Sequence, residues 1–314
     1  LDGSGAAAVS ADVALSGGTI AAAGDLHGAE ARTVIDAAGR YLTPGFIDIH
    51  RHGDAVMLTA DHGRAELADY RARLTAVRPA LSAGMLVGMG TLRACAAGFG
   101  AGPLSDEAYR AIHAALERAL ADGALGVSLG LGYAPECFYD TEGLIRALAP
   151  LRRSGRVITV HMRQEGDGVE AALEEMLTVA KALETPVEIS HLKAIGRRNW
   201  RGAVPRMLAR IAEAREEGLD VSCDVYPYPA GSTQLIHVLP PEFLSGGTAA
   251  LTAALHAPEQ RRQMRRRMET GRDFENIADL AGFDNILAAS LKRPEHRAFE
   301  GRSIAYIADA QGKD

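Results

Sequence analysis

Residues 157–191 read VITVHMRQEGDGVEAALEEMLTVAKALETPVEISH and contain one complete strand–helix–strand repeat. The repeat begins with the β-branched run 157–161, continues with an amphipathic segment at 169–183, and ends with a second β-branched run at 187–191. Short apolar runs that alternate with helices are typical of parallel βαβ units. This stretch therefore predicts an α/β fold with a parallel sheet.

The same repeat extends in both directions from this stretch. Further apolar runs occur at 46–50, 86–89, 125–129 and 220–224, and the later ones begin about 30 residues apart, the length of one strand, one helix and two short loops. Because these runs are apolar on both faces, they fit a closed barrel better than a half-exposed sheet. We predict an incomplete TIM-like (β/α) barrel in which about six strands can be placed. A doubly wound open sheet is the alternative, but no GxGxxG motif follows the first strand.

Helix signals separate these strands. Ser105 has the side chain of an N-cap before a segment with Asp106 and Glu107 in its first turn. Another helix is expected over residues 207–217, and Gly218 follows it.

Residues 1–44 have a different pattern from the rest of the chain. Short strand-like runs at 11–15, 19–23 and 33–36 are separated by glycine-rich breaks, and no helical period is present. We therefore predict two domains, a small β domain over 1–44 and the barrel over 45–314.

Composition excludes several classes of partner. The formal net charge of -6 argues against a nucleic-acid partner, and we interpret the arginine-rich run at 261–267 as a solvated helix face. No apolar run reaches the roughly 20 residues that span a bilayer, so no membrane partner is expected. The 3 cysteines form no pairing framework, which favours reduced thiols and a cytoplasmic protein. The sequence carries no signal for an oligomeric state.

Four histidines lie at the ends of predicted strands. His50 and His52 are two residues apart on the first barrel strand, so their side chains project to the same side. His161 and His191 each end a later strand, and the carboxyl ends of barrel strands are where barrel enzymes place their sites. Imidazoles that converge in this way suit a divalent cation such as zinc. The remaining histidines are interpreted as ordinary loop or helix-surface residues: His27, His62, His113, His237, His256 and His296.

Several motifs together resemble one enzyme family. The stretches HMRQEG (161–166), ISHLK (189–193), DVYPY (224–228) and GALGVSLGL (123–131) are similar to those of the N-acyl-D-amino-acid deacylases, or D-aminoacylases, of the metal-dependent amidohydrolase superfamily. The resemblance covers nearly the whole chain. Residues 1–44 resemble the β-sandwich strands that precede the amidohydrolase barrel.

The resemblance implies specific roles for matching residues. His50 and His52 match ligands of one metal position, and His161 and His191 match ligands of the other, which implies one or two zinc ions. The positions that match the substrate pocket are Lys193, which binds the substrate carboxylate, and Tyr133, Tyr226 and Ser232. The implied partner is a small-molecule N-acyl-D-amino acid, hydrolysed to a D-amino acid and a carboxylate.

Two pieces of the family pattern have no counterpart here. The family has a metal-binding cysteine on its second barrel strand, and neither Cys95 nor Cys223 matches it; we interpret Cys223 as a core residue. The family's general base is an aspartate on the last strand, which is absent from this chain, and Asp224 and Glu165 are the carboxylates near strand ends that could substitute. We therefore expect an internally deleted, truncated member of the family, and expect these 314 residues alone to hydrolyse nothing at a useful rate.

Two alternatives stay open at this point. The chain could be a cyclic-amide hydrolase of the dihydroorotase or hydantoinase kind, although such enzymes bridge two metals with a modified lysine for which no site matches. It could also be a non-catalytic barrel remnant, which the missing cysteine and aspartate would favour. The identity of the D-amino acid side chain and of the acyl group is not readable.

Overall fold

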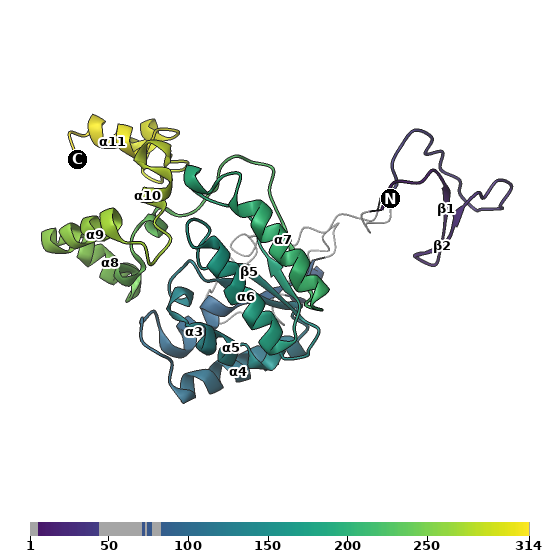
Figure 1. Cartoon of the computed structure of the whole chain (residues 1–314), viewed down its shortest axis with the longest axis horizontal. Coiled ribbons are helices and arrows are strands. Elements are labelled where there is room, and N and C mark those ends of the chain that lie inside the picture. The colour runs from purple at the N-terminus through teal and green to yellow at the C-terminus, as the bar shows by residue number, and fades with distance from the viewer. Residues whose placement is uncertain (1–5, 44–70, 73, 77–82, 314) are drawn as a thin grey trace. The chain divides into compact units, whose positions relative to one another are not determined.

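The computed structural model describes residues 6–43, 71–72, 74–76 and 83–313. The chain divides into two compact units, Leu1–Ala55 and Val56–Asp314 (Figure 1). The predicted first barrel strand at 46–50, with His50 and His52, lies outside the described residues, as does the predicted domain boundary after residue 44.

The first unit contains a β-hairpin. Strands β1 (Asp12–Ser16) and β2 (Thr19–Gly24) pair antiparallel, and Gly17 and Gly18 form the turn with positive φ angles of 60° and 82°, which suit a two-residue hairpin turn. The strand predicted at 33–36 is wrong, since this segment has no regular secondary structure. Its apolar residues Val34 and Ile35 are 81% and 83% exposed, so they pack against little of the described part of the chain.

The second unit is built on one parallel sheet. Its five strands follow the sequence order β3-β4-β5-β6-β7, and each neighbouring pair is parallel. The strands are β3 (Leu86–Gly88), β4 (Gly126–Gly130), β5 (Val157–His161), β6 (Val187–Ile189) and β7 (Val221–Cys223). The prediction of an α/β fold with a parallel sheet is confirmed. Closure of this sheet into a barrel remains a prediction, because within the described part of the chain β3 and β7 each pair on one side only.

Helices follow each strand, and the longest were predicted well. They are α3 (Met89–Ala97), α4 (Asp106–Ala121), α5 (Thr141–Ala147), α6 (Val169–Leu183) and α7 (Ala203–Glu216), followed after β7 by α8 (Gly247–His256), α9 (Pro258–Thr270), α10 (Ile277–Ala281) and α11 (Ile304–Ala310). The α6 helix has both predicted ends. The α7 helix begins at Ala203, four residues earlier than predicted, because Pro205 lies in its first turn, where proline is tolerated. No helix among those described is long and apolar enough to cross a membrane.

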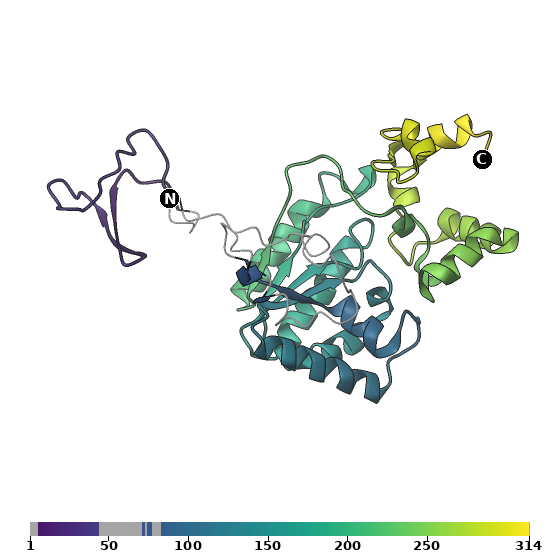
Figure 2. The ribbon, with the colours of Figure 1, turned by 180° about the vertical axis from the view of Figure 1, so that it is seen from behind.

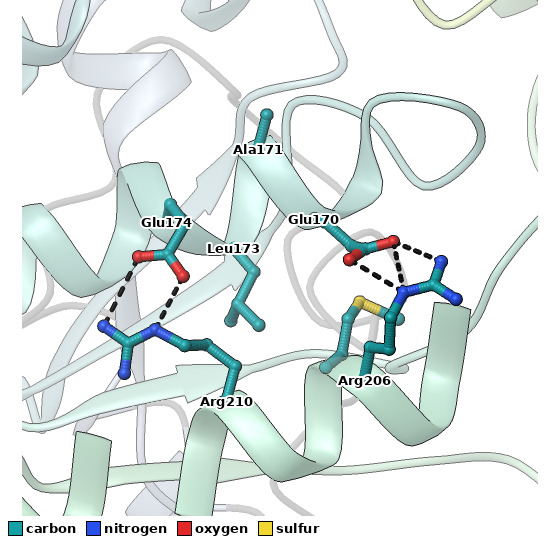
Figure 3. Close-up of a pocket in the computed structure, with 7 residues that line it drawn as sticks. Glu170, Ala171, Leu173, Glu174, Arg206 and Arg210 are labelled. Carbon is teal, nitrogen blue, oxygen red and sulfur yellow. Dashed lines mark hydrogen bonds and ion pairs between the residues drawn. The ribbon is translucent and has the colours of Figure 1, made fainter. Parts of the chain in front are cut away.

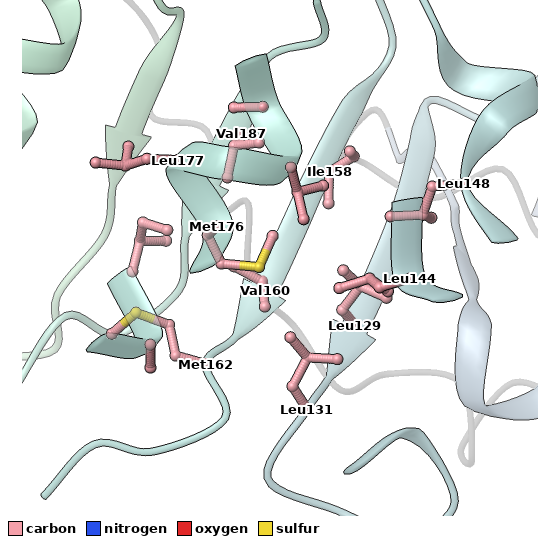
Figure 4. Close-up of a cluster of buried hydrophobic side chains, with 14 of the residues drawn as sticks. Leu129, Leu131, Leu144, Leu148, Ile158, Val160, Met162, Met176, Leu177 and Val187 are labelled. Carbon is pink, nitrogen blue, oxygen red and sulfur yellow. The ribbon is translucent and has the colours of Figure 1, made fainter. Parts of the chain in front are cut away.

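One face of the sheet packs against the helices. Val127 and Leu129 of β4, and Ile158 and Val160 of β5, alternate with residues of the opposite face and join a single apolar cluster (Figure 4). The same cluster includes Leu144 of α5, Leu148 directly after it, and Met176 and Leu177 of α6. Burial of such side chains contributes about 1.5–3 kcal/mol each.

The opposite face of the sheet is polar. Ser128 of β4, Thr159 of β5 and Glu188 of β6 occupy the alternate positions, and the last two are buried. The prediction that the strands are apolar on both faces is therefore wrong. Cys223, predicted to lie in the core, is exposed at the end of the edge strand β7. The polar face matters because His161, the last residue of β5, has the same strand parity as Thr159.

Ion pairs join α6 to α7 along a shallow surface pocket. Arg206 reaches Glu170 at 2.5 Å, and Arg210 reaches Glu174 at 2.7 Å, on either side of Leu173 (Figure 3). Both pairs are solvent-exposed, and such pairs contribute about 0–1 kcal/mol each.

The arginine-rich run forms part of α9, which lies beside α8 (Figure 2). The two helices pack around Leu251 and Met264. Its arginines pair with acidic neighbours: Arg262 with Glu259 at 2.5 Å, and Arg267 with Glu242 at 2.6 Å. This pairing agrees with the interpretation of a solvated helix face.

Ser105→Ala is expected to lower the free energy of unfolding by about 1 kcal/mol. The Ser105 side chain accepts a hydrogen bond from the backbone N–H of Ala108 and thereby caps α4. Urea denaturation measures the change, and Ser290→Ala, at an exposed position, is the control. Equal stability of the two variants would contradict the capping role.

Candidate metal and substrate site

The site lies where β5 and β6 end. His161 is the last residue of β5, and His191 follows β6 by two residues. Because neighbouring parallel strands end at the same edge, the two imidazoles meet: His161 Nδ1 lies 3.2 Å from His191 Nε2. The structure thus brings together these two of the four predicted ligands, and His50 and His52 lie outside the residues it describes.

The backbone of His191 is held in a left-handed conformation. Its φ is 43°, which is uncommon for a residue with a side chain. The carboxylate of Asp224, just after β7, accepts a hydrogen bond from the His191 N–H, and the Asp224 carbonyl accepts another from Leu192 at 2.9 Å. Asp224, one of the carboxylates considered as a substitute base, therefore anchors the turn that presents His191.

Glu165 supplies a carboxylate to the same place. Its side chain is 4% exposed, and Oε1 lies 2.9 Å from His191 Nδ1 and 3.8 Å from His161 Nδ1. The ligand atoms of His161, Glu165 and His191 all lie within 4.8 Å of one another. Lys193 completes the group, with Nζ 2.6 Å from Glu165 Oε1.

The protonation states suit metal binding. Burial lowers the pKa of His161 to about 4, so its imidazole is neutral near pH 7. Burial alone would raise the pKa of Glu165, but the hydrogen bond from His191 and the nearby positive charges bring it below its usual value. Metal ligands must be neutral imidazoles and ionised carboxylates. This site offers both.

The donor atoms fit a zinc ion. Two nitrogens that each lie about 2.0–2.1 Å from a tetrahedral zinc are about 3.4 Å apart, and His161 Nδ1 and His191 Nε2 are separated by 3.2 Å. His191 Nδ1 faces Glu165 Oε1, and a carboxylate behind a ligand histidine fixes its tautomer and orientation.

Two tyrosines predicted for the substrate pocket line this cluster. The Tyr133 ring stacks on His161 with centroids 4.4 Å apart, and its hydroxyl lies 3.3 Å from His161 Nδ1. Burial raises the pKa of Tyr133 to about 12, so the hydroxyl remains a donor. The Tyr226 ring lies beneath the Lys193 ammonium, with Nζ 5.6 Å from the centroid.

Ser232, the fourth predicted pocket residue, is exposed on the segment after β7. Its neighbour Thr233 reaches the site, where its side chain hydrogen-bonds Tyr133.

Two residues near the site were missed in the sequence. His237 was interpreted as an ordinary surface residue, but its ring lies 4.2 Å from that of Tyr133, and its Nδ1 is buried without a hydrogen-bond partner among the described residues. Glu275 lies about a hundred residues after Glu165 and binds the backbone beside it. No local pattern marks either residue, because each arrives from the segment that follows β7.

Comparisons with known proteins show which proteins this chain resembles. No family model matches the chain. It is 33% identical to the D-aminoacylase of Alcaligenes xylosoxydans xylosoxydans over 88% of its own length and 63% of that protein. This chain is a homologue of the D-aminoacylases. It is also 35% identical to the N-acyl-D-glutamate deacylase of the same organism, over 75% of the chain and 57% of that protein.

A solved N-acyl-D-glutamate deacylase resembles this chain in structure. The N-acyl-D-glutamate deacylase of Bordetella bronchiseptica, solved with zinc and a phosphonate inhibitor that mimics the tetrahedral intermediate, matches 100% of this chain and 66% of its own, with a TM-score of 0.72 and 28% identity. The chain thus spans less than two thirds of the length of the D-aminoacylase relatives it matches.

Proposed function

We propose that the protein containing this chain is a zinc-dependent deacylase that hydrolyses N-acyl-D-amino acids to a D-amino acid and a carboxylate. The observation that carries this proposal is the cluster of His161, Glu165 and His191 beside the cationic Lys193. A site with metal-ligand chemistry next to a fixed cation suits an amide substrate that carries a free carboxylate. The deacylases among the relatives support the same reading.

The proposal includes a metal centre of one or two divalent ions. We assign His161 and His191 to one position and His50 and His52 to the other, in a TIM-like barrel completed by strands beyond the five described. When bound, zinc polarises a carbonyl and lowers the pKa of a bound water to near 7.

Lys193 is the group that we assign to the substrate carboxylate. An ammonium group has three N–H donors, and the Lys193 ammonium lies within hydrogen-bonding distance of Glu165 Oε1, His191 Nδ1 and the His191 carbonyl. With Nδ1 of His191 protonated and directed to Glu165, two donors of Lys193 are used and the third can reach the substrate. Tyr133, Tyr226 and Ser232 would form the pocket around it.

We further propose that the protein is a cytoplasmic enzyme that acts on a small-molecule substrate. Cys95, Cys137 and Cys223 are all free thiols in the structure, and reduced cysteines are typical of a reducing compartment.

The proposal is tested by comparing enantiomers. The zinc-loaded protein is incubated with N-acetyl-D- and N-acetyl-L-amino acids, both acidic and apolar, and release of the free amine is measured. Hydrolysis of the D-compounds alone is expected. Preference for the L-compounds, or for a hydantoin or dihydropyrimidine, would contradict the proposal and favour a cyclic-amide or other hydrolase. Turnover of none of these would favour a non-catalytic remnant.

A further inference from the structure

A carboxylate from a distant segment binds the backbone at Glu165. Oε2 of Glu275, just before α10, accepts hydrogen bonds from the N–H of Glu165 at 2.9 Å and the N–H of Gly166 at 3.3 Å. The two bonds therefore fix the orientation of the two peptide groups that flank Glu165.

The same turn is held from its other side. The Glu165 carbonyl accepts a hydrogen bond from the N–H of Ile195 at 2.7 Å, which ties it to the loop after His191. Leu280 of α10 packs directly on Gly166 and Gly196, so closely that a Cβ on Gly166 would clash with its side chain. Both backbone groups of Glu165 are thus engaged, and a larger residue at Gly166 would force the Leu280 side chain to shift.

The consequence is a fixed direction for the Glu165 side chain. With its backbone held, the carboxylate reaches His191 Nδ1 at 2.9 Å and Lys193 Nζ at 2.6 Å. We propose that Glu275 is a positioning residue for the metal and carboxylate-binding site, and that it acts through Glu165. This inference rests on the proposed function, because it assigns to Glu275 an effect on zinc binding at His161 and His191.

A simpler account is that Glu275 only holds α10 against the turn that contains Glu165 and Gly166. A second polar contact holds the same helix without involving Glu165. Arg198 forms ion pairs with Asp167 and with Asp279 of α10, at 2.6 Å from each. Asp279→Asn therefore weakens docking without changing the Glu165 turn. It is the matched control for variants of Glu275.

The experiment measures zinc affinity by competition with a chromophoric chelator. Glu275→Ala is expected to weaken zinc binding about tenfold, as loss of residues that orient metal ligands typically does. Glu275→Gln, which keeps an acceptor, should restore most of the affinity, and Asp279→Asn should change it less than twofold. In a Glu165→Gln background, Glu275→Ala should add less than twofold, because residues that act through one another are not additive.

Three results would overturn the inference: equal losses in Glu275→Ala and Asp279→Asn, no rescue by Glu275→Gln, or an undiminished effect of Glu275→Ala beside Glu165→Gln. Hydrogen exchange of the wild-type protein is an independent check that needs no variant to fold. The amides of Glu165 and Gly166 should exchange at least tenfold more slowly than that of Asp167 in the same turn, and equal rates would also overturn it.

The outcomes separate this inference from the proposed function. If the wild-type protein binds zinc and the Glu275 variants bind it equally well, the positioning role is refuted and the proposed function stands. A wild-type protein that binds no zinc refutes the metal site itself. In that case the effect of Glu275→Ala on zinc binding is refuted with it, whatever the exchange rates show.

Discussion

His161→Ala is expected to lower turnover of an N-acyl-D-amino acid by at least about a thousandfold. A metal ion supplies several kcal/mol of transition-state stabilisation, and about 1.4 kcal/mol corresponds to a tenfold change in rate. His161 contributes Nδ1 to the cluster, 3.2 Å from His191 Nε2, so its loss leaves the metal position short of a ligand. Zinc content, measured on the same preparations, should fall in parallel.

The matched control is His256→Ala, the same change at the exposed end of α8, which should leave both turnover and zinc content unchanged. Retention of full zinc content and activity by His161→Ala would show that the ion is bound elsewhere.

Lys193→Met is expected to raise KM for N-acyl-D-amino acids by about 10- to 100-fold, since a hydrogen bond to a charged group is worth about 1.5–3 kcal/mol. Zinc content should change little, because His161 and His191 both remain. The Lys193 side chain is 22% exposed, so its ammonium is accessible to a ligand while Glu165 holds it in place. Steady-state kinetics with paired metal analysis measure both effects.

Lys181→Met, on the exposed surface of α6, controls for loss of a positive charge alone. If Lys193→Met lost its zinc while KM for the remaining active fraction stayed constant, Lys193 would support the metal site and would not bind the substrate.

Local periodicity predicted most of the parallel sheet. The runs at 157–161 and 187–191 became β5 and β6, and the segment 169–183 became α6, because each carries its own pattern of buried side chains. The run at 33–36 has the composition of a strand, but strands also need a neighbour, and composition does not show one. The polar face of the sheet was missed because the runs are too short to establish an alternating pattern: VITV has only Thr159 as a polar residue, and VEIS has Glu188 and Ser190.

In the site, too, the residues marked by a local sequence pattern could be predicted, and those that the fold brings from distant segments could not. His161 and His191 were found because each ends a strand, and parallel strands place such ends together. Arg163 and Lys193 each follow one of these histidines by two residues, yet Arg163 turns away to Glu175 at 2.8 Å whereas Lys193 joins the cluster. Glu275 and His237 could not be found at all, because chain topology, and no local motif, brings them to the site.

The central claim is that His161 and His191 bind the zinc ion of an N-acyl-D-amino-acid deacylase. Its most direct test is a crystal structure of the zinc-loaded protein with data collected on both sides of the zinc absorption edge. We predict an anomalous peak about 2.0–2.1 Å from one nitrogen of each histidine, with Glu165 still beside His191. An active, zinc-containing protein whose anomalous peaks all lie away from His161 and His191 would contradict the claim.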